Sequence, residues 1–126
     1  MSKVISISQN LTSSTVLSIP NNAIPFTPSR FILKSVSLFG SNAVSASSNT
    51  GLYQINSSLI NGDIMYLFSV NNTILSATSN VVSLTSNPDI TFLLPNGANN
   101  ITFTVANLNN AIVAVCFISI TLEFLL

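Results

Sequence analysis

The chain has 126 residues, of which 48% are hydrophobic and only 5% are charged. Three basic and three acidic residues leave a formal net charge of zero, and histidine is absent. Intrinsic disorder is excluded, because it requires low hydrophobicity and usually a high net charge. A typical soluble domain is about 25% charged, so Asn, Ser and Thr supply nearly all the polarity of this chain.

Short β-rich runs separated by turn residues begin at the N-terminus. The first run, Lys3 to Ser8, alternates polar and apolar side chains, and the second, Thr15 to Ile19, ends before Pro20. Alternation with a period of two indicates strands with one buried face. No signal peptide is expected, because residues 1–10 lack a continuous apolar segment.

The third run, Arg30 to Phe39, is long and changes phase within its length. Its apolar residues alternate up to Leu33 and resume out of phase at Val36. A slip of one residue within an alternating strand predicts a β-bulge near residues 34–35. The small residues of 40–49 then predict a surface loop.

Further β-rich runs follow, separated by turn signals such as Asn61-Gly62-Asp63. The segment 64–70 is compatible with a strand or a short helix, and the C-terminal run 111–126 is too short for a membrane helix and contains Glu123. About eight strands at even spacing predict one all-β domain over residues 1–126, an antiparallel, jelly-roll-like β-sandwich. The remaining expected strands are Leu52 to Ile55, Val81 to Thr85, Asp89 to Leu94, Ile101 to Val105 and residues 118–124.

The residues needed for common catalytic chemistry are missing. Without histidine, Cys–His and Ser–His nucleophilic mechanisms are excluded. A carboxylate pair could come only from Asp63, Asp89 and Glu123, and the first two lie in predicted turns. Cys116 lies in an apolar run, where a buried thiol is expected. We therefore predict no enzymatic activity, no catalytic residues, no cofactor and no metal site.

The scarcity of charge also bears on partners. Nucleic-acid binding rests on a basic surface, which three scattered cations cannot form, so neither nucleic acid nor a membrane is an expected partner. Tyr53 and Tyr66 are expected at the margins of the core. Sheet edges with few lysines and a net charge near zero favour association. We therefore expect a structural protein that forms homo-oligomers or joins a larger shell.

Several segments occur in an order found in one class of viral protein. They are Phe31-Ile32-Leu33-Lys34-Ser35-Val36, a small-residue loop, Gly51-Leu52-Tyr53, Asn61-Gly62, Met65-Tyr66-Leu67, Val82-Ser83-Leu84-Thr85 and Val113 to Glu123. Over residues 30–124 the chain resembles small phage virion proteins of the head-decoration or cement type. The resemblance implies a β-sandwich on the outer capsid surface of a bacteriophage, often a trimer, that stabilises the lattice of the major capsid protein.

On this interpretation residues 1–29 form an N-terminal arm or added strands, and partners are the major capsid protein or other virion subunits. We expect contacts from residues 1–10 and from the loops at 40–49 and 71–80. The alternative is a glycan- or receptor-binding module of a viral fibre or tail. Its Asn-rich loops would bind a sugar, and Tyr53 or Tyr66 would stack on it.

Overall fold

The computed structural model describes residues 1–11, 14–20, 22–41, 50–57, 64–71, 81–94, 101–108 and 116–126. Nine strands form within these residues: β1 (Ser2–Asn10), β2 (Ser14–Ser18), β3 (Arg30–Ser41), β4 (Thr50–Ser57), β5 (Ile64–Asn71), β6 (Val81–Ser86), β7 (Ile90–Leu93), β8 (Thr102–Asn107) and β9 (Cys116–Leu125). This described part contains no helix with the length and apolar character needed to cross a membrane.

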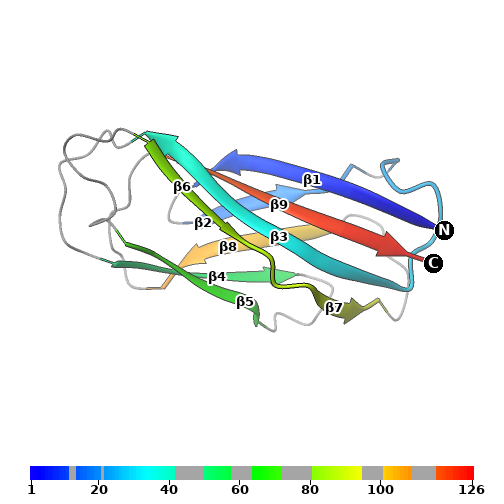
Figure 1. Cartoon of the computed structure of the whole chain (residues 1–126). Coiled ribbons are helices and arrows are strands. Elements are labelled where there is room, and N and C mark those ends of the chain that lie inside the picture. The colour runs from blue at the N-terminus through cyan, green and yellow to red at the C-terminus, as the bar shows by residue number, and fades with distance from the viewer. Residues whose placement is uncertain are drawn as a thin grey trace.

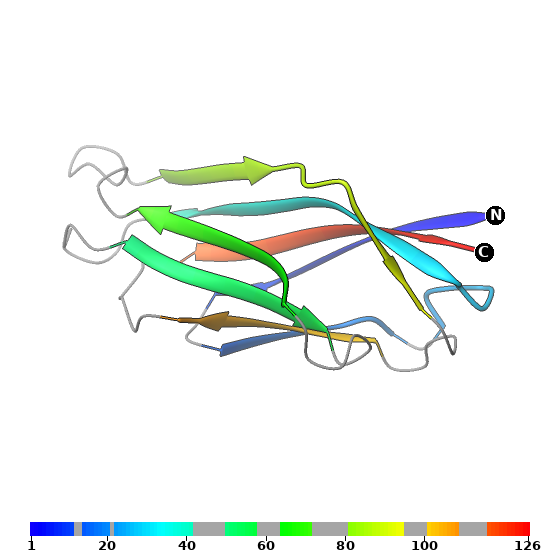
Figure 2. The same cartoon turned by 90° about the horizontal axis from the view of Figure 1, so that it is seen from below.

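The strands form two layers (Figures 1 and 2). The first sheet has the order β1-β9-β3-β6, with β7 also paired to β3, and the second sheet has the order β2-β8-β4-β5. β6 pairs with the stretch from Val36 to Ser41, and β7 pairs with the stretch from Arg30 to Leu33. The two short strands therefore share one edge of β3, and each sheet has four strand positions.

The pairing follows a simple rule along the chain. β1 pairs with β9, β2 with β8, β3 with β6 and β7, and β4 with β5, all of them antiparallel. The first half of the chain thus pairs with the second half in reverse order, like one long hairpin rolled into two layers. This arrangement confirms the predicted jelly-roll-like sandwich, and it shows that residues 64–71 form a strand rather than a helix.

The predicted bulge in the third run is present. The register between β3 and β9 shifts between Leu33 and Ser35, and the break between β6 and β7 lies at the same level of β3. There Lys34 Nζ lies 3.1 Å from Asp89 Oδ1. Asp89 has a φ of 50°, in the left-handed region where Asp is enriched. A bulge bends the strand that contains it, and here the break in the neighbouring edge lies beside the bulge.

Alternating side chains from both sheets fill the space between the layers, as the periodicity predicted. Phe31 of the first sheet is fully buried, and its ring centroid lies 5.8 Å from that of Phe103 in the second sheet. Phe92 and Phe124 lie at 5.2 and 5.6 Å from the same ring. Such aromatic contacts add to the free energy of area burial. Among the residues whose burial the structure describes, the core also includes Leu17, Ile19, Leu33, Val36, Leu38, Tyr53, Ile55, Met65, Leu94, Ile101, Val105, Ile118, Ile120 and Leu122.

Hydrogen bonds connect the two sheets on both open sides of the sandwich. On one side the Thr15 hydroxyl in β2 donates to the backbone carbonyl of Asn10 in β1 at 3.1 Å. On the other side the hydroxyls of Tyr66 in β5 and Ser86 in β6 lie 2.5 Å apart. The edges of the two layers are therefore joined by specific polar contacts as well as by the apolar core.

Candidate assembly surface

The outer face of the second sheet carries side chains in rows that run across its strands. Because buried and outward-facing residues alternate along a strand, the neighbours of the buried Leu17, Ile55 and Phe103 point away from the core. The strand registers place the outward residues side by side. The rows are Ser18 and Thr102; Val16, Thr104, Asn56 and Ile64; Ser14, Ala106, Gln54 and Leu67; and Leu108, Leu52 and Ser69.

The strands of the second sheet contain no charged residue. The strands of the first sheet contain Lys3, Arg30, Lys34 and Glu123, and Asp89 directly precedes β7. The last acidic residue, Asp63, lies outside the described residues. Among the described residues, all charged side chains therefore lie in the strands of the first sheet or in the connection between β6 and β7.

Apolar exposure does not distinguish the two sheets in this way. Val16 and Ile64 on the second sheet are each 54% exposed, and Val4 on the first sheet is 56% exposed. The second sheet therefore presents water with apolar, hydroxyl and amide groups alone. Within that face the Asn56 Oδ1 atom is buried and has no hydrogen-bond partner, which is uncommon for a buried acceptor.

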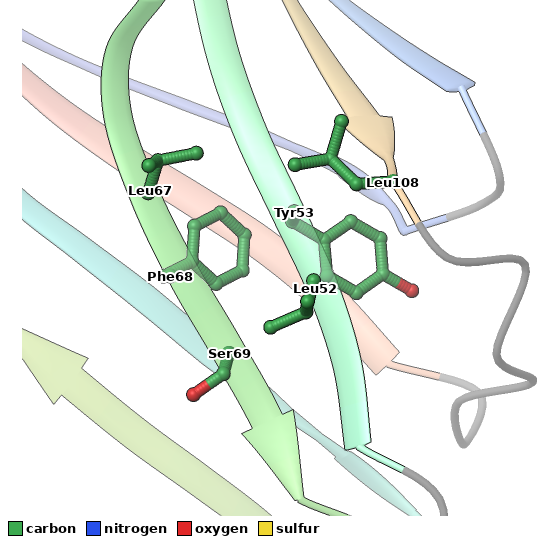
Figure 3. Close-up of a pocket in the computed structure, with 6 residues that line it drawn as sticks. All are labelled: Leu52, Tyr53, Leu67, Phe68, Ser69 and Leu108. Carbon is green, nitrogen blue, oxygen red and sulfur yellow. The ribbon is translucent and has the colours of Figure 1, made fainter.

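An open hollow of about 310 Å³ lies at one end of this face (Figure 3). Three leucines line it, together with Ser69, Tyr53 and Phe68. The rings of Tyr53 and Phe68 stack with their centroids 5.3 Å apart. Small-molecule sites normally combine an apolar lining with several convergent polar groups. This hollow is almost wholly apolar, so its chemistry suits apolar side chains better than a sugar. The leucines are Leu52, Leu67 and Leu108.

Asp89 and Glu123, the candidate acidic residues that the structure describes, are not gathered into a site. Asp89 forms the ion pair with Lys34, and Glu123 lies in the first sheet in register with Val4 and Ile32. Across the described residues there is no group of three His, Cys, Asp or Glu that could hold a metal ion. Cys116 begins β9, and its side chain lies outside what the structure describes.

Tyr66 lies at the margin of the core, as predicted, whereas Tyr53 is buried within the core. Tyr53 is only 3% exposed, which leaves no free ring face for a sugar. Tyr66 is half-buried and engages Ser86 through its hydroxyl. The stacking role that the glycan-binding alternative gave to these residues therefore has no support at Tyr53 and little at Tyr66.

The segments expected to make contacts lie only partly within the described residues. Residues 1–10 include β1, which pairs with β9 along its whole length. Residues 42–49 and 72–80 of the two expected contact loops lie outside the described residues. The uncharged face was not identified from the sequence. A signal was present, because Asp63 is the only charged residue between Lys34 and Asp89.

Comparison with known proteins supports the fold. No known protein family matches the sequence, and no curated protein matches it. A chain of the capsid asymmetric unit of cyanophage Pam1 matches with a TM-score of 0.52 and 16% identity, over 99% of this chain and 85% of that chain.

Two further structures align with lower TM-scores. A chain of the virus-like particle of extra small virus from the giant freshwater prawn Macrobrachium rosenbergii has a TM-score of 0.33 and 10% identity, with coverage of 98% and 78%. A chain of the empty head of turnip yellow mosaic virus has a TM-score of 0.31 and 10% identity, with coverage of 98% and 80%. The Pam1 match shows that this chain shares its two-layer β fold with a protein of a phage capsid.

Proposed function

We propose that the chain is a non-enzymatic structural protein of a virion that decorates or cements the outer capsid surface by bridging capsid subunits. The observation that carries this proposal is the uncharged outer face of the second sheet on a jelly-roll fold. Jelly rolls occur in viral capsids and in lectins, so the fold alone does not decide the function. The surface chemistry favours packing against another protein.

The mechanism is passive burial of surface between subunits. Apolar area removed from water contributes roughly 25 cal/mol per Å² before the costs of association are subtracted. A face without charges avoids the penalty of desolvating ions that have no partner in the interface. The same face on a protein that works alone would reduce its solubility, because surface charge opposes self-association.

The partners in this proposal are the major capsid protein or other virion subunits, including further copies of the chain. The match to a chain of the cyanophage Pam1 capsid supports the choice of a capsid setting. The resemblance to head-decoration proteins makes the proposal more specific. It implies that the virus is a bacteriophage, that the chain lies on the outside of the capsid, and that it forms a trimer. The outer position can be tested on particles.

The test uses particles of the virus that encodes the chain, banded on a density gradient. We expect the chain to co-migrate with intact particles, to be digested by protease added from outside, and to leave the particles in mild urea before the shell dissociates. A chain found only in the soluble fractions would overturn the proposal. Protection from protease until the shell opens would overturn the outer position alone.

A glycan- or receptor-binding module of a viral fibre or tail is the alternative. It is less well supported, because Tyr53 is buried and the hollow beside it lacks convergent polar groups. A glycan array separates the two functions. Specific binding that is lost on substitution of Tyr66 would favour the alternative, and a blank array would favour the structural role.

A further inference from the structure

We infer that the outer face of the second sheet packs against the same face of a second copy of this chain, across a two-fold axis parallel to the strands. The inference rests on the pattern of side chains on this face and does not depend on the virion role proposed above. In a two-fold contact the same patch is used by both copies, so the patch must complement itself.

The row that contains Val16 meets this condition. From β2 to β5 it reads Val16, Thr104, Asn56 and Ile64. A two-fold axis that runs along the strands between β8 and β4 reverses this order in the opposing copy. Val16 of each copy then faces Ile64 of the other, and Thr104 faces Asn56. Apolar groups meet apolar groups, and a hydroxyl meets an amide.

The row at the end of the face gives the same result. Leu108 and Leu52 lie side by side, with the Leu108 amide donating to the Leu52 carbonyl at 2.7 Å. The same axis places Leu108 of each copy over Leu52 of the other. The hollow that these leucines line with Leu67 would then receive apolar side chains from the opposing copy.

The unpartnered Asn56 Oδ1 atom supports the pairing in the centre of the face. An unsatisfied buried acceptor is costly, and Asn56 Oδ1 has no hydrogen-bond partner within the isolated chain. The opposing Thr104 hydroxyl is a donor at the matching position. Rotation of the Asn56 side chain would bring the two groups together.

Charge and area both favour a second copy as the occupant. A charged partner surface would lose its hydration without gaining a counter-ion here, whereas this face meets its own neutral groups. Four strands about 4.8 Å apart, with up to eight residues at about 3.3 Å each, cover roughly 500 Å². Two such faces bury about 1,000 Å² in total, at the lower limit for a specific interface, so the free protein should associate weakly.

The first experiment compares Val16→Lys with Val4→Lys by sedimentation velocity over a wide range of concentrations. The two valines lie in neighbouring edge strands on different sheets and are 54% and 56% exposed. Both substitutions add one positive charge. We expect Val16→Lys to weaken self-association at least about tenfold, because two new lysines approach the interface from the two copies. Val4→Lys should leave it within about threefold of wild type, because Val4 lies on the first sheet, outside the proposed interface.

The second experiment tests the register by charge pairing. Ile64→Glu alone should weaken association, and Val16→Lys combined with Ile64→Glu should restore it to within about threefold of wild type, because each new lysine faces a new glutamate of the other copy. Within one chain the two positions are about 14 Å apart, beyond the screening length of about 8 Å at physiological salt. Restoration must therefore act between copies.

Circular dichroism and thermal unfolding establish that each variant is folded. If Val16→Lys does not fold, Thr104→Lys places the same charge in the middle of the same face. A wild-type protein that stays monomeric at every concentration would overturn the inference. Equal effects of Val16→Lys and Val4→Lys would do so too, as would a double variant weaker than both single variants. Failure of the particle test with success of these experiments would reject the virion role alone.

Discussion

Both sheets contribute to the core, and they differ on their outer faces. On the inner side, both supply alternating apolar residues, and Phe31 of one sheet contacts Phe103 of the other. The strands of the first sheet carry four charged residues, and two of them, Arg30 and Glu123, lie in its outward-facing rows, whereas the strands of the second sheet carry none. This difference is the basis of our proposal that the second sheet packs against protein, while the first faces water.

This difference separates two roles of the same sequence. The inner residues of both sheets are constrained by packing, since a fully packed core admits neither cavities nor charges. The outer residues are free of that constraint, so their composition reports on the surroundings of each face. Substitutions inside the sandwich should consequently affect stability from either sheet alike. Substitutions on the outer faces should affect association from one sheet only.

The largest expected effect tests whether the inner faces of both sheets belong to one core. Phe31→Ala and Phe103→Ala should each lower the free energy of unfolding by about 3–5 kcal/mol, because both rings are completely buried. Urea denaturation followed by tyrosine fluorescence or circular dichroism measures the change. Val4→Ala, on an outer face, is the control and should cost less than about 1 kcal/mol.

A marked inequality between the two phenylalanines would contradict this description. If Phe103→Ala cost no more than the surface control, the second sheet would not share one core with the first. The total free energy of unfolding of a domain is only about 5–15 kcal/mol, so a variant that loses several kcal/mol can be partly unfolded before urea is added. A temperature series at low denaturant detects such variants.

The next effect concerns the side where β5 meets β6. Tyr66→Phe removes the hydroxyl that lies 2.5 Å from that of Ser86 and keeps the ring. We expect a loss of about 0.5–1.5 kcal/mol in the free energy of unfolding, the usual net value of a hydrogen bond. Ser86→Ala should have a similar effect.

A double-mutant cycle isolates this contact between the sheets. If the two hydroxyls interact directly, the double variant should lose less than the sum of the single losses. Strict additivity would show that the bond contributes nothing to joining the edges. Ser6→Ala is a useful comparison, because its hydroxyl lies 2.9 Å from that of Thr121 within the first sheet and does not bridge the layers.

Much of the fold was predictable from local pattern. Alternation located the strands. The phase change after Leu33 located the bulge, because one inserted residue reverses the order of apolar and polar positions along the rest of the strand. Segment 64–70 was ambiguous for a physical reason. Its apolar residues do not alternate strictly, since Met65 is inserted at a second bulge where the register shifts beside Asn56.

The candidate surface was harder to predict from the sequence than the fold. Each strand of the second sheet is unremarkable alone, and only the order β2-β8-β4-β5 brings four uncharged strands together. Likewise Val16 and Ile64 are distant in the sequence but share a row through the pairings of β2 with β8, β8 with β4, and β4 with β5. A surface made by long-range pairing requires the topology before it can be recognised.

The smallest expected effect concerns the ion pair on the first sheet. Asp89→Asn removes the charge opposite Lys34 and retains a residue that tolerates the left-handed conformation at φ 50°. Because both side chains are substantially exposed, we expect a loss of at most about 1 kcal/mol. That loss should shrink as salt is added, since salt screens exposed charges.

Asp89→Ala separates charge from backbone conformation at the same position. It removes the same charge, but its Cβ makes the left-handed region unfavourable by roughly 1–2 kcal/mol without a local hydrogen bond to offset it. Its stability should therefore fall below that of Asp89→Asn at every salt concentration. If the two variants matched at high salt, the positive φ would have no measurable cost. If the stability of neither variant responded to salt, the ion pair would contribute nothing to the stability of the first sheet. The charges of that sheet would then matter only for its contact with water.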